Sequence, residues 1–152
     1  MSIVLFVCTG NLCRSPMAEG LLGERLAARS LAARHHVQSA GTWAADGEPA
    51  SEPAITVMAE RGIDITGHRS HALTSDHIAE ADLILVMGQE HARVIRSTWP
   101  QYEWKVRLLS EMSGKRRDIP DPYGRPIDDY RACADSLQRY IDAGMERILE
   151  FL

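Results

Sequence analysis

A cysteine and an arginine, Cys8 and Arg14, stand near the start of the chain with five residues between them. This layout is typical of a phosphate-binding loop, in which backbone N–H groups of a tight turn and of a following helix converge on one anion. The cysteine provides a nucleophile inside the loop, and a guanidinium can hold two phosphate oxygens at once through its planar fork. Residues 8–16 are therefore predicted to bind a phosphoryl group next to a nucleophile.

The chemistry of such a loop requires the ionised form of Cys8. A thiolate is the reactive species, whereas an isolated cysteine is mostly protonated at neutral pH. The helix start, the converging N–H groups and Arg14 would all stabilise the anion, so we expect Cys8 to attack phosphorus in line and form a cysteinyl-phosphate. The leaving oxygen then needs a proton and the intermediate needs an activated water, which calls for a general acid from elsewhere in the chain.

The best source of that acid is a stiff loop near the C-terminus, residues 118–124, whose sequence is Asp-Ile-Pro-Asp-Pro-Tyr-Gly. Pro122 restricts the backbone of Asp121 to extended conformations, which helps to aim the carboxylate. For this reason we favour Asp121 over Asp118 as the general acid. Tyr123 is expected to flank the ring of a substrate.

Short apolar runs of strand length alternate with helical patterns along the chain. Strands are predicted at residues 3–7, 37–40, 83–87 and 105–109, and helices after the loop, at 53–61, at 75–79 with Ser75 as its N-cap, around 92–95 and from 130 to 152. This alternation predicts an α/β fold, a single-domain three-layer sandwich in which a four-stranded parallel sheet has helices on both faces. The loop after the first strand would then lie at the carboxyl end of the sheet, where ligands bind in such folds.

The boundary between the loop and the first helix carries its own signals. Ser15 is predicted to be the N-cap and Pro16 to lie in the first turn. Glu19 is expected to favour the positive end of the helix. Gly10 is expected to give the loop its freedom to turn.

Composition excludes several classes of protein. A chain of 152 residues with 45% hydrophobic side chains can bury one core, so residues 1–152 are expected to form one domain. The net charge of −4 argues against a general nucleic-acid binder. No apolar run has the length of a membrane span and no leader peptide is recognisable, so we expect a cytoplasmic protein without membrane insertion. The cysteines and histidines show no metal-ligand spacing, and neither a metal nor a cofactor is expected.

Four motifs together resemble the low-molecular-weight protein tyrosine phosphatase family, in its bacterial type. They follow one another in the family's order and cover the whole chain: Cys8-(five residues)-Arg14-Ser15, Ser39-Ala40-Gly41-Thr42, Gly62-Ile63-Asp64 with His68-Arg69-Ser70, and Asp121-Pro122-Tyr123. The resemblance implies that Cys8 is the nucleophile, that Arg14 clamps the phosphate, and that Asp121 acts first as general acid and then as general base.

The resemblance also implies roles for the other residues of the site. Those expected to bind phosphate or substrate are Thr9, Gly10, Asn11, Leu12, Cys13, Ser15, Trp43 and Tyr123. Ser39 and His68 would join Asn11 and Ser15 in a supporting network that holds the loop in a strained shape. In that network Ser15 would be hydrogen-bonded to the sulfur of Cys8. Asparagine is one of the few residues that tolerate a left-handed backbone, which fits this role of Asn11.

Cys13 has two interpretations that the sequence leaves open. It packs under the loop, or it forms a reversible disulfide with Cys8 that protects the nucleophile from irreversible oxidation. Cys133 lies on the predicted apolar face of the last helix and is expected to be structural.

The resemblance implies a function: hydrolysis of phosphotyrosine in proteins, within a deep loop walled by Leu12, Tyr123 and Trp43. The phosphotyrosine substrate implied for a bacterial member is a tyrosine kinase that controls exopolysaccharide export. One alternative is a protein-arginine phosphatase, although relatives of that kind carry threonine where Leu12 stands. A second is a thiol-dependent arsenate reductase, which needs a relay of further cysteines of which only Cys133 remains. A phosphotyrosine-binding module without turnover is disfavoured, because nucleophile, clamp and acid are all present.

Overall fold

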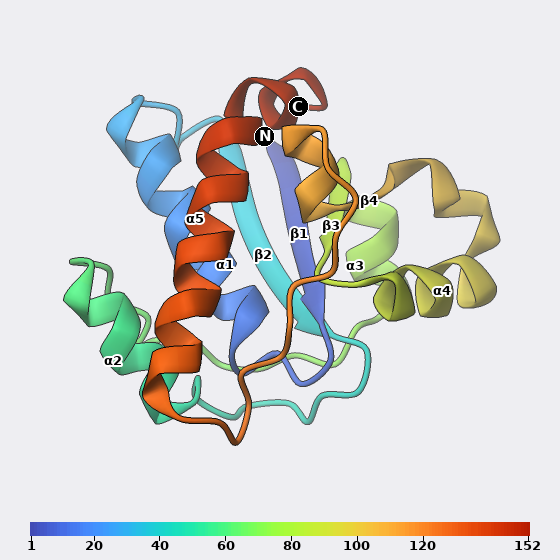
Figure 1. The fold of residues 1–152 in the computed structure, drawn as a ribbon. Helices are drawn as coiled ribbons and strands as arrows, with labels where there is room; N and C mark the ends of the chain where they lie inside the picture. The colour runs from blue at the N-terminus through green and yellow to red at the C-terminus, as the bar shows by residue number, and fades with distance from the viewer.

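A four-stranded parallel sheet forms the centre of the computed structural model, which describes residues 1–152 (Figure 1). Its strands are β1 (Ser2–Cys8), β2 (His35–Gly41), β3 (Leu83–Val86) and β4 (Val106–Leu108), in the order β2-β1-β3-β4. Each predicted strand is found, with ends that differ by at most two residues. In the register of the two neighbours β1 and β2, Cys8 lies opposite Gly41. Cys8 therefore stands at the carboxyl edge of a central strand.

Five α-helices and two 3₁₀-helices surround the sheet. They are α1 (Arg14–Ala28), α2 (Glu52–Glu60), α3 (Ser75–Glu80), α4 (Gln89–Thr98) and α5 (Ile127–Glu150), with η1 (Pro100–Lys105) and η2 (Leu109–Ser113) on either side of β4. None of these helices combines the length and the apolarity that crossing a bilayer requires.

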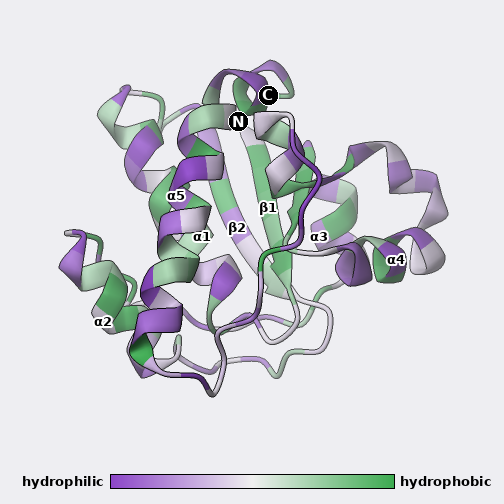
Figure 2. Ribbon diagram, in the orientation of Figure 1, coloured by the Kyte–Doolittle hydropathy of each residue, from purple (hydrophilic) through white to green (hydrophobic).

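The sheet separates two hydrophobic clusters, which confirms the predicted three layers. Side chains of β1 alternate between them: Val4 and Phe6 belong to the larger cluster, under α1, α2 and α5, and Leu5 and Val7 to the smaller one, under α3 and α4. Figure 1 shows these two groups of helices on opposite sides of the sheet. In Figure 2 β1 is hydrophobic along its length, as a strand buried on both faces must be.

Two predicted helix starts differ from the structure. Helix α1 begins at Arg14 with Cys13 as its N-cap residue, and no side chain caps it, so the predicted N-cap role of Ser15 is wrong. Ser15 lies inside the first turn, where its hydroxyl is free to bond elsewhere. At α3 the cap is Thr74 rather than Ser75, because Thr74 has the extended backbone of a cap residue and its side chain accepts from His77 N–H.

The long helix α5 crosses the larger cluster and packs closely against η2. Its apolar face is buried at Tyr130, Cys133, Ala134, Leu137, Ile141, Met145 and Ile148. Gly144 lies on the same face, and a Cβ built there would be 2.6 Å from Cβ of Met112 and 2.9 Å from its carbonyl carbon. A glycine in mid-helix weakens the helix, but here it allows η2 to approach the helix backbone.

Candidate active site

Residues 9–13 form a loop between β1 and α1 whose carbonyl groups point away from its centre. Three of these carbonyls accept hydrogen bonds from the surrounding protein: Thr9 from Trp43 N–H (2.9 Å), Asn11 from His68 Nε2 (2.8 Å) and Leu12 from Ser51 N–H (2.9 Å). By contrast, no protein group accepts from the backbone N–H groups of residues 9–15. A turn whose carbonyls are held outside, followed by a helix start, presents its N–H groups to an anion.

Gly41 permits the close packing of this loop against the end of β2. A Cβ at position 41 would lie 2.4 Å from the carbonyl oxygen of Thr9 and 3.0 Å from the amide nitrogen of Asn11. Only glycine fits at that distance. Gly10, which the sequence predicts to give the loop its freedom to turn, has a conformation that an alanine could adopt. The unusual backbone conformation of the loop is found at Asn11 instead.

Asn11 is the residue with the left-handed backbone, at φ 58°. Its buried side-chain amide makes three hydrogen bonds: Nδ2 donates to Ser15 Oγ (2.7 Å) and to Ser39 Oγ (3.0 Å), and Oδ1 accepts from His71 N–H (2.9 Å). These bonds compensate for the strain of the backbone, since each would be lost if Asn11 relaxed. The expected network of Asn11, Ser15, Ser39 and His68 is thus assembled in the structure.

Glu19 belongs to this network and not to the first turn of α1, where we had expected it to act on the helix dipole. Its Oε1 accepts from Ser39 Oγ at 2.6 Å, and the first turn holds no acidic residue. The hydroxyl of Ser39 therefore receives from Asn11 and donates to Glu19, which gives it one defined orientation.

The thiol of Cys8 is buried and lies 2.9 Å from Ser15 Oγ. Because Ser15 Oγ already accepts from Asn11, its own proton is available to the sulfur. A hydroxyl that donates to sulfur stabilises the thiolate, as do the N–H groups at the start of α1. Because Ser15 does not cap α1, its hydroxyl is free to contact the sulfur of Cys8.

The guanidinium of Arg14 is held over the same loop and is only 4% exposed. Nη1 donates to the carbonyl of Ile119 at 2.9 Å, and Nη2 lies 3.5 Å from Thr9 Oγ1. Nη2 is also 3.6 Å from a carboxylate oxygen of Asp121. A buried arginine held by neutral oxygens on two sides keeps its charge available to an anion.

Of the two aspartates in the 118–124 loop, Asp121 faces the site and Asp118 does not. Asp121 lines the same cavity as Cys8 and its side chain is 49% exposed. Its Oδ1 accepts from Tyr123 N–H at 3.1 Å, which orients the carboxylate. Asp118 instead accepts from Gln89 N–H at 3.0 Å and so stabilises the start of α4.

Above the loop is a cavity of about 360 Å³ in which polar groups lie at the base and apolar ones around them. It is lined by Cys8, Thr9, Gly10, Leu12, Cys13, Arg14, Trp43, Asp121 and Tyr123. Two aromatic side chains form its rim, Trp43 at 87% exposure and Tyr123 at 64%. All nine lining residues were predicted for the site, whereas Asn11 and Ser15, which were also predicted to bind phosphate, are buried and do not line the cavity.

The other two cysteines are buried and their thiols are held in the protonated form. Cys13 Sγ is hydrogen-bonded to Ser51 Oγ (3.2 Å) and to Tyr130 Oη (3.4 Å). Burial raises the pKa of Cys13, and it raises the pKa of Cys133 to about 12 and that of Tyr130 to about 12. Cys13 packs under the loop, as one of its two interpretations holds; the disulfide with Cys8 stays a prediction.

Two contacts of the site lie outside the predicted residues. The carbonyl of Ile119 receives Arg14, and His91 Nε2 lies 2.9 Å from Thr9 Oγ1. Backbone carbonyls leave no signal in a sequence. His91 has a weak one: it follows β3, the neighbour of β1, at the start of the next helix, and the carboxyl ends of both strands meet at one edge.

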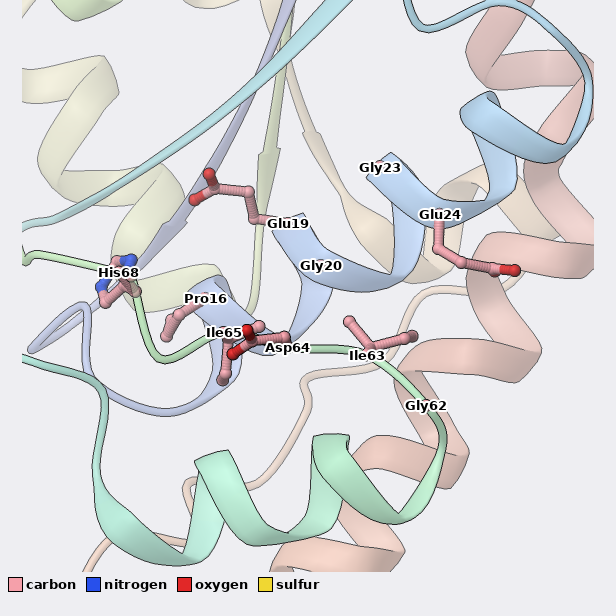
Figure 3. Close-up of a pocket in the computed structure, with 11 residues that line it drawn as sticks. Pro16, Glu19, Gly20, Gly23, Glu24, Gly62, Ile63, Asp64, Ile65 and His68 are labelled. Atoms are coloured by element: carbon pink, nitrogen blue, oxygen red, sulfur yellow. The ribbon is translucent and has the colours of Figure 1, made fainter.

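A second hollow, of about 480 Å³, lies behind the loop between α1 and residues 62–68 (Figure 3). Figure 3 shows His68 and Pro16 at one end of it and Glu24 at the other. It holds the carboxylates of Glu19, Glu24 and Asp64 but no nucleophile and no arginine. The hollow is therefore unsuited to a phosphate.

In chemical terms, the site combines a sulfur nucleophile in an anion-binding loop, a fixed guanidinium and a carboxyl group on the opposite side. This is the set required for attack on a phosphoryl group with protonation of the leaving oxygen.

Comparisons with known proteins agree with this chemistry. The family model for low molecular weight phosphotyrosine protein phosphatases matches residues 3–150. A probable low molecular weight protein-tyrosine-phosphatase, EpsP of Ralstonia nicotianae, is 41% identical over 95% of this chain and 94% of its own. A protein-arginine-phosphatase of Geobacillus stearothermophilus is 41% identical over 95% of each chain.

A solved structure gives the same result for the fold. The low molecular weight protein tyrosine phosphatase from T. tengcongensis superposes with a TM-score of 0.91, at 40% identity, over 97% of this chain and 99% of that one. Together with the family model, which spans nearly the whole chain, this structural match identifies the protein as an enzyme, a hydrolase that acts on phosphoproteins. The chain belongs to the low molecular weight phosphotyrosine protein phosphatase family.

Proposed function

We propose that this chain hydrolyses phosphotyrosine in proteins. The observation that carries the proposal is the shape of the cavity above Cys8, where apolar and aromatic side chains surround a polar base. An aryl ring would lie between Leu12, Trp43 and Tyr123 while its phosphoryl group reaches the N–H groups of the loop. A phosphoserine is too short to place its phosphorus at the thiolate from the same rim.

In the proposed reaction the Cys8 thiolate attacks phosphorus in line and the bond to the tyrosine oxygen breaks. Asp121, protonated at that point, gives its proton to the departing oxygen. Arg14 and the N–H groups of residues 9–15 stabilise the charge on the transferring oxygens. A water molecule then attacks phosphorus and gives a proton to the Asp121 carboxylate, the phosphorus–sulfur bond breaks, and phosphate leaves.

Leu12 supports phosphotyrosine over phosphoarginine as the substrate. The relatives above include one named for each activity at the same identity, so overall identity does not distinguish the two. The leucine side chain lines the cavity and offers an apolar contact to a ring but no hydrogen-bond partner to a guanidine N–H. Burying such N–H groups without a partner is unfavourable.

Thiol-dependent arsenate reduction is not supported by the remaining cysteines. That chemistry needs further thiolates, each of which attacks the oxidised sulfur left by the previous step and forms a disulfide with it. Burial holds the pKa of Cys133 near 12, and Cys13 is hydrogen-bonded beneath the loop. Both thiols are therefore held in the less reactive protonated form, and no further cysteine remains to complete such a relay.

For the partner and the location, we infer a phosphorylated tyrosine kinase as the protein substrate and the cytoplasm as the compartment. The kinase rests on the resemblance to bacterial members of the family. The location is supported by a mechanism that needs Cys8 as a free thiol, because the cytosol keeps thiols reduced.

The test compares phosphotyrosine, phosphoserine and phosphoarginine peptides on the wild-type enzyme and three variants. Cys8→Ser should abolish phosphate release, and Asp121→Asn should lower kcat on phosphotyrosine by about 100-fold or more. The matched control is Asp118→Asn, which should change kcat only a few-fold because that carboxylate bonds to α4 and not to the site. Equal loss in both aspartate variants would contradict the role of Asp121.

The same peptides test the substrate class. The wild type should release phosphate from phosphotyrosine and much less from the other two, and Leu12→Thr should shift the ratio towards phosphoarginine. A wild type that prefers phosphoarginine would overturn the proposed specificity while leaving the mechanism intact.

A further inference from the structure

His91 is a buried histidine whose ring is only half satisfied. It lies in the first turn of α4 and is 1% exposed. Nε2 is 2.9 Å from Thr9 Oγ1, whereas Nδ1 is buried with no hydrogen-bond partner. An imidazole in such a place costs free energy that an apolar side chain would not. The one hydrogen bond of the ring is to Thr9 of the anion-binding loop.

A row of polar groups extends from His91 through Thr9 and Arg14 to Asp121. Thr9 Oγ1 is 3.5 Å from Arg14 Nη2, and the same nitrogen is 3.6 Å from Asp121. A threonine hydroxyl has one proton and two lone pairs, and a guanidinium can only donate. Arg14 therefore occupies one lone pair of Thr9 Oγ1. Whether His91 donates or accepts then determines whether the second lone pair or the hydroxyl proton is used in their hydrogen bond.

The position of the single proton of His91 follows from burial. Desolvation, and next the charge of Arg14, lower the pKa of His91 to about 4, against the opposing effects of Asp118 and Asp121. The ring is therefore neutral and carries one N–H. A buried acceptor without a partner is tolerated better than a buried donor without one, which leaves Nδ1 unprotonated. The N–H is then on Nε2 and donates to Thr9.

We propose that His91 is a positioning residue which, together with Arg14, occupies both lone pairs of Thr9 Oγ1 and so makes the Thr9 hydroxyl a directed donor to the substrate. With both lone pairs taken, the hydroxyl proton points into the cavity that Thr9 lines. The acceptor is an oxygen of the phosphoryl group bound beside Arg14. A donor held in place before the reaction stabilises developing charge without reorganisation. This rests on the reaction proposed above and adds a group to it.

The test is a double-mutant cycle on Thr9→Val and His91→Leu, read as kcat/KM on an aryl phosphate. Each single change should lower kcat/KM by about 10- to 100-fold, the value of a hydrogen bond to a charged group. Because both changes remove one and the same donor, the double variant should be no slower than the slower single variant.

Two conservative variants separate positioning from packing. His91→Gln keeps an N–H donor near the place of Nε2 and should recover most of the activity, as should Thr9→Ser, which keeps the hydroxyl. If His91→Leu does not fold, His91→Met fills a similar volume in the same cycle. Additive losses in the double variant, or His91→Gln as slow as His91→Leu at equal thermal stability, would overturn the proposal.

Binding of inorganic phosphate, measured by calorimetry, gives a second readout that does not depend on turnover. Thr9→Val should weaken phosphate binding by a factor similar to its loss of kcat/KM. If the wild type binds phosphate and loses affinity in Thr9→Val but releases nothing from aryl phosphates, the proposed function fails and the role of Thr9 stands. Unchanged phosphate affinity in Thr9→Val and His91→Leu would count against the role itself.

Discussion

Asn11 and Gly41 determine the shape of the anion-binding loop more than any residue that would touch a substrate. Asn11 holds a left-handed backbone through three side-chain hydrogen bonds, and Gly41 allows the loop backbone to pass close to the end of β2. Neither contributes a reactive group. Their effect is to leave the backbone N–H groups of residues 9–15 without internal partners and directed at one point.

A prediction at this scale concerns His91 and pH. Its pKa is about 4 in the folded protein and about 6.5 in an unfolded chain, so the unfolded state binds more protons between these values. The free energy of unfolding should therefore fall as pH decreases from 7.5 to 4, by at most about 3 kcal/mol from this residue.

Urea unfolding of the wild type and of His91→Gln at pH 7.5, 6 and 5 checks this. The wild type should lose more stability than the variant over the same range. The charged groups facing His91 are Arg14, Asp118 and Asp121, with Glu90 at 3.6 Å from Nε2, and both proteins retain them. Parallel curves for the two proteins would show that His91 is not kept neutral by folding.

At the scale of elements, the contact of α5 with η2 depends on a single missing side chain. Gly144→Ala should lower the thermal midpoint, because the steric conflict with Met112 exceeds the gain in helix propensity. Gly23→Ala in α1 is the matched control, since a Cβ there meets nothing within 4 Å. The control should gain up to about 1 kcal/mol, which is about 2–4 °C for a protein of this size.

Differential scanning calorimetry of both variants measures the two effects together. The midpoints should move in opposite directions. A rise in both would mean that η2 yields to the added methyl group without cost.

The elements themselves were predictable from sequence because their apolar runs are strong. Residues 3–7 and 83–87 are continuous apolar stretches of strand length, and the long helix repeats at three and four residues. The start of α1 was not predictable in the same way, because Ser15 has the residue type of a cap but its hydroxyl contacts the sulfur of Cys8 instead. A propensity describes the local chain, and here a tertiary contact takes precedence.

At the scale of the whole molecule, an anion bound at the loop should stabilise the fold. Phosphate at 100 times its dissociation constant adds about 2.7 kcal/mol, or about 5–10 °C in the thermal midpoint. Cys8→Ser should keep this shift, because the N–H groups and Arg14 remain. Arg14→Lys should lose most of it, because an ammonium lacks the planar fork.

Thermal scans over a phosphate titration, with sodium chloride at equal ionic strength as the control, measure this stabilisation. A shift of the same size in chloride would assign the effect to general screening. A full shift in Arg14→Lys would remove the guanidinium from the anion site.

How far the site could be predicted depends on the distance along the chain. The Cys8 to Ser15 loop is a local pattern, and its chemistry follows from residue types. The pairing with Asp121, more than a hundred residues away, was inferred from required chemistry and from the family resemblance, since order in sequence does not give proximity. The Ile119 carbonyl and the Thr9–His91 contact escaped prediction because they depend on the relative placement of β1, β3 and the 118–124 loop.

The hydrogen bond from Arg14 to the carbonyl of Ile119 makes one rigid unit of two parts of the active site. The loop that carries the proposed acid is tied, two residues before Asp121, to the side chain proposed to hold the phosphoryl group. The relative position of the Asp121 carboxyl group and the phosphate site is therefore fixed by one contact. A displacement of the Arg14 guanidinium would move both. In the proposed mechanism, this bond holds the proton donor beside the phosphoryl group without a closing movement of the 118–124 loop.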